Sequence, residues 1–420
     1  MFALADCNNF FVSCERAFQP ELEGRAVVVL SNNDGCIVAR SNESKAMGIK
    51  MGTPFFQVKS LVEQGSLVVR SSNYTLYGDL SRRVMAILGE TFPKVEPYSI
   101  DEAFLPVEGI PIKKVISSSR DVICRIRRCT GIPVSIGLAP TRTLAKVANH
   151  FAKKYPAYGG VCTIDTTEKR LKALSLTPVD DVWGIGWRVA PRLQQRGIRT
   201  ALDFASLPDK AVYKELGITG LRTWKELNGI PAIESEPIQR RKSICTSRSF
   251  ANTTDNLGEL EKKVADFAAI CAAKLREEGS AAGSVQVFLL TNRFREDQKQ
   301  DFATMTVDLP VECSSTKEIV DAALAALRTV YKKGYQYKKA GVTVFDIVPD
   351  DSVQGVLFGY DQKNREKQDR LSRVMDSLNS RDNQLLRLAS QRKGHYADGI
   401  RRDYCSKLFS TSWKDMIEIH

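Results

Sequence analysis

Residues that commonly bind zinc are scarce in this 420-residue sequence. It has only three histidines, and its ten cysteines are scattered without a Cys-x-x-Cys pair. Because zinc sites are built from closely spaced cysteine and histidine ligands, this composition argues against a zinc protein. The scattered cysteines are typical of reduced thiols in a cytoplasmic protein.

Hydrophobic runs long enough to cross a bilayer are also missing. The longest uncharged apolar runs are of the size of Phe267 to Ala273, whereas a spanning helix needs about 20 residues. The opening MFALADCNNFF has no positive leader before its short apolar run, so we expect no signal peptide. We find no basic amphipathic helix with a bulky apolar face either. These features predict a cytoplasmic protein without a membrane partner.

What the sequence has in excess is positive charge. Lysine and arginine number 61 against 49 acidic residues, which gives a formal net charge of +12. An excess of this size favours a polyanionic partner, with nucleic acid first. The chain is too long for one hydrophobic core, so we expect about two to four domains.

The first part of the chain mixes strand and helix patterns. Apolar runs predict strands, and apolar residues at helical spacing predict helices. This order predicts an α/β sheet with antiparallel pairs. The predicted strands are 1–6, 24–31, 94–99, 102–107 and 133–139, and the predicted helices are 42–52 (ended by Gly48), a helix from Leu76, 113–129 and 142–154.

The pattern changes beyond Leu176. Short helices with tight turns follow, and a polar, proline-containing stretch at 233–243 predicts a linker. Residues 243–349 then give strand-helix-strand-strand-helix-strand, the split βαβ pattern of a separate small domain. After Pro349 the chain is charged and weakly periodic, which predicts a tail that orders only on a partner.

Two adjacent carboxylates, Asp101 and Glu102, stand inside the otherwise apolar segment PYSIDEAFL. Asp6 ends the first predicted strand, and three carboxylates on neighbouring strands would repel one another unless cations neutralised them. Oxygen ligands without histidine or cysteine favour Mg²⁺. Two such ions about 4 Å apart can activate a 3′-hydroxyl and stabilise a leaving pyrophosphate. Taken alone, however, the Asp-Glu pair is more typical of a solvated hairpin tip.

Four motifs favour the metal site. ADCNNFF, SIDEAF, GLAPTRTLAK and VWGIG follow one another in an order and spacing that resemble the Y-family translesion DNA polymerases. Within that family, LSNNDGCIVARS and PYSIDEAF are most similar to the catalytic subunit of bacterial DNA polymerase V. The resemblance covers residues 1–350 and continues more weakly beyond them.

The resemblance implies an α+β multidomain fold, the right-hand polymerase. Its parts would be a ferredoxin-like palm, small fingers, a helical thumb with a helix-hairpin-helix and a split βαβ little finger. The implied ranges are 1–23 and 75–170 for the palm, 24–74 for the fingers, 171–235 for the thumb, 236–242 for a linker, 243–349 for the little finger and 350–420 for a partner-binding tail.

The resemblance also implies the catalytic residues. Asp6, Asp101 and Glu102, with the backbone carbonyl of Cys7, would hold two Mg²⁺ ions. Phe11 would lie beneath the sugar of the incoming nucleotide and exclude a 2′-hydroxyl, where many relatives have Tyr, and Phe10 would join it in nucleotide binding. The alternative for both rings is the hydrophobic core, because an aromatic pair after a strand usually packs there.

Two lysines are implied as triphosphate ligands, Lys45 and Lys153. Lys45 stands where relatives often have Arg. Lysine keeps the positive charge but cannot form the two parallel hydrogen bonds that a guanidinium makes to a phosphate. Asn42 replaces a Tyr that touches the phosphates in many relatives. Most lysines on helices are simply solvated, and that remains the alternative for each lysine alone.

DNA contacts are implied at two places. Gly184 and Gly186 in VWGIG, with Arg188, Arg192 and Arg196 beside them, would form a helix-hairpin-helix turn whose amides face a DNA phosphate. The alternative is an ordinary turn. The basic residues before and within the little finger would grip the template backbone, or else form a solvated linker; they are Arg240, Arg241, Lys242 and Arg248.

In the tail, QGVLF matches the bacterial clamp-binding pattern, with Gln354, Leu357 and Phe358 as anchors. Chance or a buried turn is the alternative. The implied partners are primer-template DNA, deoxynucleoside triphosphates, the sliding clamp, the RecA filament and the processed accessory-protein dimer of polymerase V. The implied location is cytoplasmic and nucleoid-associated.

The expected function is template-directed, low-fidelity DNA synthesis across damaged bases by two-metal nucleotidyl transfer, in the SOS response. A Mg²⁺-dependent structure-specific nuclease is one rival, but it has no use for Phe11, Lys45 and Lys153 in the roles above. A catalytically silent DNA- or RecA-binding scaffold is the other, and the intact carboxylates count against it.

Overall fold

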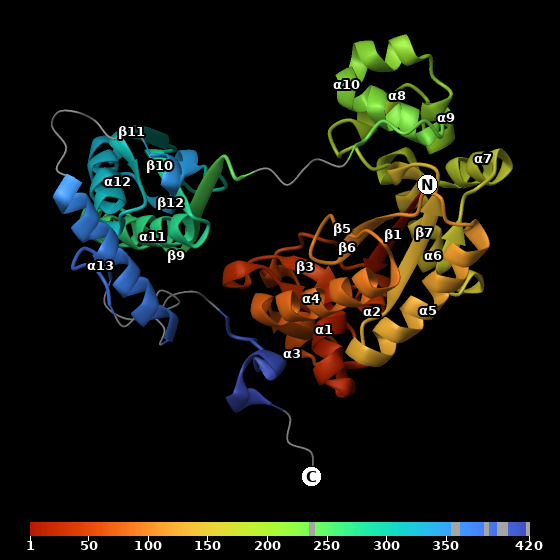
Figure 1. The fold of residues 1–420 in the computed structure, drawn as a ribbon, viewed down its shortest axis with the longest axis horizontal. Coiled ribbons are helices and arrows are strands. Elements are labelled where there is room, and N and C mark those ends of the chain that lie inside the picture. The colour runs from red at the N-terminus through yellow and green to blue at the C-terminus, as the bar shows by residue number, and fades with distance from the viewer. Residues whose placement is uncertain (235–239, 354–361, 382–385, 393–401, 417–420) are drawn as a thin grey trace. The chain divides into compact units, whose positions relative to one another are not determined.

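A computed structural model describes residues 1–234, 240–353, 362–381, 386–392 and 402–416. The chain forms two compact units, one of Met1–Pro237 with Arg402–His420, and one of Ile238–Arg401. Figure 1 labels their helices and strands. Among the described residues, none of the helices is both long enough and apolar enough to cross a membrane.

The first unit is built on a five-stranded sheet with the order β5-β6-β1-β7-β8. Strand β1 lies at its centre and pairs antiparallel with β6 and β7, whereas β7 and β8 are parallel. This central place explains why the first residues of the chain are almost entirely apolar. The strands are β1 (Phe2–Cys7), β5 (Glu96–Pro97), β6 (Glu102–Pro106), β7 (Val134–Ala139) and β8 (Val161–Thr163).

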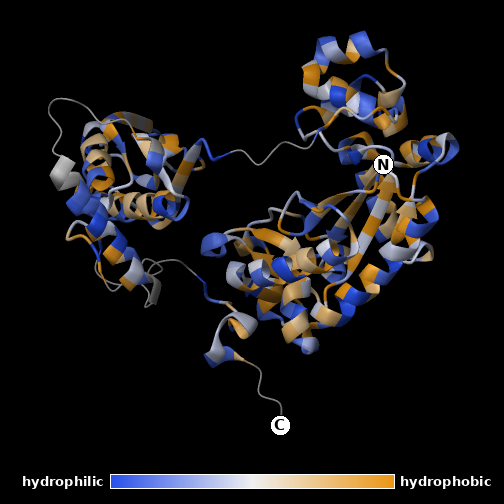
Figure 2. Ribbon diagram, in the orientation of Figure 1, coloured by the Kyte–Doolittle hydropathy of each residue, from blue (hydrophilic) through white to orange (hydrophobic). Residues whose placement is uncertain are grey.

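The two faces of β1 are covered by different helices. Ala3, Ala5 and Cys7 share a core with α1, α4 and α5, while Leu4 packs with α6. Because alternate side chains of a strand point to opposite faces, Asp6 lies on the same face as Leu4. Figure 2 shows the apolar colouring of these central strands. The helices are α1 (Phe10–Phe18), α4 (Tyr74–Thr91), α5 (Ile112–Thr130) and α6 (Arg142–Lys154).

Helix α6 lies unusually close to the sheet. A Cβ atom on Gly137 of β7 would come within 2.2 Å of the Ala145 carbonyl oxygen. The Asn149 side-chain amide donates to the backbone carbonyls of Leu4 at 3.2 Å and Ser135 at 2.7 Å. These contacts fix which residues of α6 stand over which residues of β1.

A smaller sheet with the order β3-β2-β4 follows α1 in sequence. It has its own core, which includes Val28, Leu30, Ile37 and Phe55. The predicted strand at 24–31 is confirmed as β2, but β3 and β4 were not predicted. The predicted helix at 42–52 is shorter than expected. The elements are β2 (Val27–Leu30), β3 (Ile37–Arg40), α2 (Asn42–Ala46), α3 (Lys59–Glu63) and β4 (Val68–Ser71).

The helical region after β8 is confirmed. Its helices are α7 (Thr167–Leu176), α8 (Ala190–Gln195), α9 (Ala201–Ala205) and α10 (Asp209–Leu227). The fully buried Glu226 of α10 accepts a hydrogen bond from the Thr143 backbone N–H at 2.9 Å. A second oxygen of this carboxylate accepts from the backbone N–H groups of Ala232 and Ile233. One buried carboxylate therefore joins α10 to the start of α6.

The second unit has the predicted split βαβ pattern. Strand β12 lies between β9 and β10 in the order β11-β10-β12-β9, and all neighbours are antiparallel. Helix α13 is joined to α11 through Arg276 and Asp376 at 2.6 Å. The elements are β9 (Ser243–Thr254), α11 (Leu257–Glu277), β10 (Ser280–Thr291), β11 (Phe302–Cys313), α12 (Thr316–Val330), β12 (Tyr337–Pro349) and α13 (Gln362–Arg381).

The prediction that the tail orders only on a partner is wrong for its described segments. Residues 402–416, which we call the C-terminal segment, pack on the first unit. The Ser71 backbone N–H donates to the Tyr404 carbonyl at 3.0 Å. The Phe409 ring is buried and stacks on Phe18 with centroids 4.9 Å apart. The tail is charged and weakly periodic, so its sequence has no local pattern that marks these few anchoring residues.

The packing of α6 on β7 makes a testable prediction. Gly137→Ala forces a methyl group against backbone atoms that cannot move aside, so it should lower the free energy of unfolding by about 3 kcal/mol or more. The matched control is Gly89→Ala in α4, where a Cβ meets nothing within 4 Å. That control should be neutral or stabilising by up to about 1 kcal/mol. Urea unfolding followed by circular dichroism measures both; equal effects would contradict the packing.

Candidate active site

The pairing of β1 with β6 brings the predicted carboxylates together. Asp6 lies directly opposite Glu102 in the antiparallel register. The Cys7 backbone N–H donates to the Asp101 carbonyl oxygen at 2.9 Å. Burial, together with the Asp6 and Asp101 carboxylates, raises the pKa of the Cys7 thiol well above its usual range. Residues far apart in sequence therefore form one acidic site at the end of β1.

Ser99 shapes the turn that presents the two adjacent carboxylates. Its hydroxyl oxygen accepts the backbone N–H groups of Asp101 at 3.2 Å and Glu102 at 3.1 Å. The same hydroxyl donates to an Asp101 carboxylate oxygen at 2.5 Å. Asp101 thus stays in the turn, while Glu102 begins the strand and faces α6.

Two lysines of α6 pair with two carboxylates of this acidic site. The Lys153 ammonium lies 2.6 Å from Asp6 Oδ1, and the Lys146 ammonium lies 2.8 Å from Glu102 Oε2. They are seven residues apart, about two helical turns, and so share one face of the helix. Lys146 was missed in the sequence analysis. Its signal was its position as the last residue of GLAPTRTLAK.

The carboxylates remain short of positive charge despite these lysines. Burial raises the pKa of Asp6 to about 7, and a hydrogen bond with Glu102 adds to this effect against the influence of Lys153. For Glu102, burial acts to raise the pKa, but hydrogen bonds from Asp6 and Lys146 outweigh it and lower the pKa. At neutral pH Asp6 is therefore only partly ionised, and a cation could replace its proton.

The donor set fits Mg²⁺. Asp6, Asp101, Glu102 and the Cys7 carbonyl supply only hard oxygen atoms, which magnesium prefers. In the described part of the chain, no three acidic, histidine or cysteine side chains are arranged so that they could hold a metal ion as they stand. Lys153 and Lys146 instead hold two of the carboxylates. A divalent ion would take over the charge balance that the raised Asp6 pKa shows to be incomplete.

The aromatic pair after β1 divides into two environments. The Phe10 ring is buried in the core, 3% exposed, so its predicted contact with a nucleotide does not hold for the side chain. The Phe11 ring is only partly buried and stacks on Tyr77, with centroids 4.5 Å apart and planes at 16°. The Tyr74 ring meets Phe11 edge-on at 5.9 Å.

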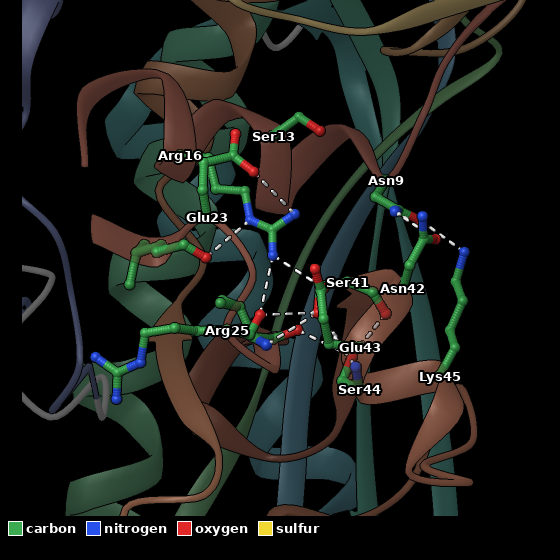
Figure 3. Close-up of polar contacts among 12 residues, drawn as sticks. Asn9, Ser13, Arg16, Glu23, Arg25, Ser41, Asn42, Glu43, Ser44 and Lys45 are labelled. Carbon is green, nitrogen blue, oxygen red and sulfur yellow. Dashed lines mark hydrogen bonds and ion pairs between the residues drawn. The ribbon is translucent and has the colours of Figure 1, made fainter. Parts of the chain in front are cut away.

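Lys45 takes part in a polar network beside the site. Its ammonium donates to Asn9 Oδ1 at 2.6 Å, and the Asn9 amide donates to Asn42 Oδ1 at 3.0 Å. Figure 3 shows these three side chains converging from α2 and the start of α1. Burial lowers the pKa of Lys45, and nearby Arg40 and Lys153 lower it further.

Arg40, Lys45 and Lys153 thus form a cationic cluster, and sequence reasoning missed Arg40. Its guanidinium donates to the Ile49 carbonyl at 2.6 Å, which places it beside α2. Positive charges held close together in this way favour the binding of an anion. The cluster adjoins the carboxylates through the contact of Lys153 with Asp6.

The predicted helix-hairpin-helix turn has a conformation that requires glycine at one position. Gly184 has a φ of 96°, and a Cβ there would lie 2.5 Å from Thr223 Oγ1. The backbone N–H groups of Val189 and Ala190 donate to the Gly186 carbonyl as α8 begins. The Arg188 guanidinium lies over the largely exposed Trp187 ring at 4.8 Å.

The other predicted contacts lie in the second unit. Arg240, Arg241 and Lys242 are exposed, and Arg241 pairs with Glu278 at 3.2 Å. Arg248 lies on β9, opposite Ala340 of β12. The predicted clamp-binding residues lie outside the described residues; they are Gln354, Leu357 and Phe358.

The raised Asp6 pKa predicts how stability depends on pH and Mg²⁺. The folded pKa of about 7 exceeds the ordinary value of 3.8, so the contribution of Asp6 to metal-free stability is fully present below the ordinary value and is lost as pH rises through the folded one. Mg²⁺ replaces the proton, so it should raise the melting temperature more at about pH 8 than at about pH 5.5. Differential scanning calorimetry with and without Mg²⁺ measures both increments.

The Asp6→Asn variant should lose this pH-dependent increment. Glu63→Gln, at an exposed ion pair with Lys59, is the matched control and should keep it. An increment that is the same at both pH values, or that persists in Asp6→Asn, would contradict metal binding at this carboxylate.

Two family models match the chain. The model described as the impB/mucB/samB family matches residues 5–150, and the model of that family's C-terminal domain matches residues 241–357. The first match contains the three carboxylates, Arg40 and Lys45, and it ends three residues before Lys153. The second contains the split βαβ fold.

Curated relatives match over the whole chain. It is 37% identical to Protein ImpB of Salmonella typhimurium over 99% of both chains. It is 36% identical to Protein UmuC of Salmonella typhimurium strain LT2 over the full length of both. It is also 29% identical to DNA polymerase IV of Moorella thermoacetica, over 90% of this chain and 92% of that relative.

Solved structures share the fold. A Y-family DNA polymerase chimera matches with a TM-score of 0.65 and 22% identity, over 83% of this chain and 99% of the other. An insertion ternary complex of Dbh DNA polymerase matches with a TM-score of 0.55, 22% identity and the same coverage. With its sequence relatives in agreement over the whole chain, the chain belongs to the impB/mucB/samB family, and it has the fold of the Y-family DNA polymerases.

Proposed function

We propose that Asp6, Asp101, Glu102 and the carbonyl of Cys7 hold two Mg²⁺ ions for template-directed nucleotidyl transfer across damaged DNA in the SOS response. The observation that carries this proposal is the register of β1 with β6, which sets Asp6 opposite Glu102 and beside Asp101. When bound, the ions activate the primer 3′-hydroxyl and stabilise the leaving pyrophosphate.

The lysines have a second role in this proposal. Lys153 holds Asp6 and Lys146 holds Glu102 while the carboxylates lack a metal. Once cations take over these carboxylates, the Lys153 ammonium is free to pair with a phosphate of the incoming nucleotide. The Lys153 side chain would then join Lys45 and Arg40 in binding the triphosphate, since Arg40 and Lys153 already act electrostatically on Lys45.

Phe11 would act as the sugar gate. Its ring is only partly buried and is supported from behind by Tyr77, so it presents a rigid apolar surface to the sugar of a nucleotide. A 2′-hydroxyl would meet that ring without a hydrogen-bond partner, which disfavours ribonucleotides. The Asn9–Asn42–Lys45 network supplies the polar contacts at the position where many relatives have Tyr.

We further propose the family's domain roles for the observed elements. The five-stranded sheet with α4, α5 and α6 would be the palm, the small β3-β2-β4 sheet the fingers, and α7 to α10 the thumb. The split βαβ unit would be the little finger. The ranges proposed for them are 1–23 and 75–170, 24–74, 171–235 and 243–349, with 236–242 as linker.

Primer-template DNA would be held through its phosphates. The turn at Gly184 and Gly186 with Arg188 would contact one strand, and the exposed basic residues from Arg240 to Lys242, with Arg248, would contact the template backbone. Contacts to phosphates carry no sequence information, which suits a polymerase that copies any template. Such binding should weaken steeply with added salt.

The remaining partners rest on the family. We propose that Gln354, Leu357 and Phe358 bind the sliding clamp, and that a processed accessory dimer and the RecA filament support synthesis. A cytoplasmic, nucleoid-associated location follows from such partners. The nuclease and the silent scaffold have no support in the family membership, and we do not retain them.

Glu102→Ala tests the metal site. Removing this carboxylate should lower Mg²⁺-dependent primer extension by about 10²- to 10³-fold or more, because a group that stabilises the charged transition state is lost. Primer-template affinity, measured by fluorescence anisotropy, should stay within about twofold of the parent. Extension assays on undamaged and abasic templates, with clamp, activated RecA and accessory dimer present, give the rates.

The matched control is Glu108→Ala, an exposed acid just beyond the same strand. It should extend primers at the parental rate. Normal extension by Glu102→Ala, or an equal loss in Glu108→Ala, would remove Glu102 from the metal-binding set.

A further inference from the structure

The proposed sugar gate has a buried support. Phe11 stacks on Tyr77, and the Tyr77 side chain is completely buried beneath it. A buried ring in a close-packed core has few alternative positions. The location of Phe11 relative to a bound sugar is therefore set by whatever fixes Tyr77.

A buried carboxylate fixes Tyr77. The Tyr77 hydroxyl donates to Glu15 Oε1 at 2.6 Å, and Glu15 is fully buried in α1. The other oxygen, Oε2, has no hydrogen-bond partner among the described residues. Because a buried carboxylate is costly without donors, each hydrogen bond to Oε1 matters for keeping Glu15 in place.

The second donor to Glu15 comes from the far end of the chain. The Ser406 hydroxyl donates to the same Oε1 atom at 3.2 Å. The Asn73 side-chain amide donates to Ser406 Oγ and to the Lys407 carbonyl, both at 3.0 Å. Asn73 also caps the start of α4 through the Leu76 N–H, so it joins Ser406 to the helix that carries Tyr77.

The rest of the C-terminal segment holds Ser406 at this point. Tyr404 is bound to Ser71 through paired backbone and hydroxyl contacts. The Phe409 ring stacks on Phe18 of α1. The Ser410 hydroxyl donates to Asp79 of α4 at 2.9 Å. Ser406 is thus fixed on both sides, by anchors on the small sheet and on the two helices that meet at the gate.

We propose that Ser406 and Glu15 are positioning residues for sugar discrimination, acting on Phe11 through Tyr77. The inference rests on the proposed function, in which Phe11 lies beneath the sugar of the incoming nucleotide. Ser406 and the Tyr77 hydroxyl hold Glu15, Glu15 holds the Tyr77 ring, and that ring supports the gate. Loss of either hydroxyl leaves Glu15 with one donor and lets the stacked rings shift away from the sugar.

The experiment compares insertion of a deoxynucleotide and of the matching ribonucleotide by the full-length chain in its active assembly. The kcat/KM ratio of the two sugars is measured for Ser406→Ala and Tyr77→Phe. Each should reduce discrimination by about five- to tenfold, the size of one typical net hydrogen-bond contribution. Deoxynucleotide insertion itself should stay within about threefold of the parent, because neither hydroxyl touches the nucleotide.

Ser410→Ala is the matched control. It removes a hydroxyl contact from the same segment to α4 but not to Glu15, so discrimination should be unchanged. Phe11→Ala sets the value for an open gate. Adding Ser406→Ala to Phe11→Ala should cause no further loss, because Ser406 acts only through that ring.

Three results separate the possible failures. If Phe11→Ala leaves discrimination intact, the proposed sugar gate is wrong and this inference falls with it. If Phe11→Ala opens the gate but Ser406→Ala and Tyr77→Phe do not, the gate stands and the inference is overturned. An equal loss in Ser410→Ala would also overturn it, because the segment would then act through general stability rather than through Glu15.

Discussion

Asp6 and Glu102 lie opposite one another only because β1 and β6 pair in one register, and much of the first unit serves to keep that register. A slip of one residue would turn Asp6 to the opposite face of the sheet. There it would meet the apolar core of α1, α4 and α5 instead of the lysines of α6. The buried alanines of β1 and the close approach of α6 at Gly137 both resist such a slip.

The carboxylates of the site depend on lysines of α6 for their charge balance. Burial raises the pKa of Asp6 although Lys153 pairs with it, whereas Lys146 helps to lower the pKa of Glu102. Lys153 also acts electrostatically on Lys45, beside which we propose that the triphosphate binds. If the lysine ammonium groups move away from the carboxylates as metal and nucleotide bind, no buried charge is left unpaired.

Local pattern and family motifs predicted much of this site from sequence. The sequence alone was enough to recognise the apolar run of β1, the split βαβ order and the carboxylates of PYSIDEAFL. The order of the strands in the sheet could not be predicted, because the pairing of Asp6 with Glu102 depends on tertiary packing. Lys146 and Arg40 were missed because a single lysine or arginine is normally a solvated residue. Phe10 was assigned beside Phe11, although both begin helix α1, where successive side chains point about 100° apart and so lie in different environments. The contacts of Ser406 with Glu15 cross most of the chain, and no local signal marks them.

The most direct test of the account is to locate the metal. Mn²⁺ can replace Mg²⁺ in a crystal of the chain with primer-template DNA and a non-hydrolysable deoxynucleotide, and its anomalous scattering marks each ion. The account predicts two ions about 4 Å apart, bound by Asp6, Asp101, Glu102 and the Cys7 carbonyl, with Lys153 moved from Asp6 to a phosphate. Ions bound elsewhere, or a Lys153–Asp6 pair that persists beside the bound nucleotide, would contradict it.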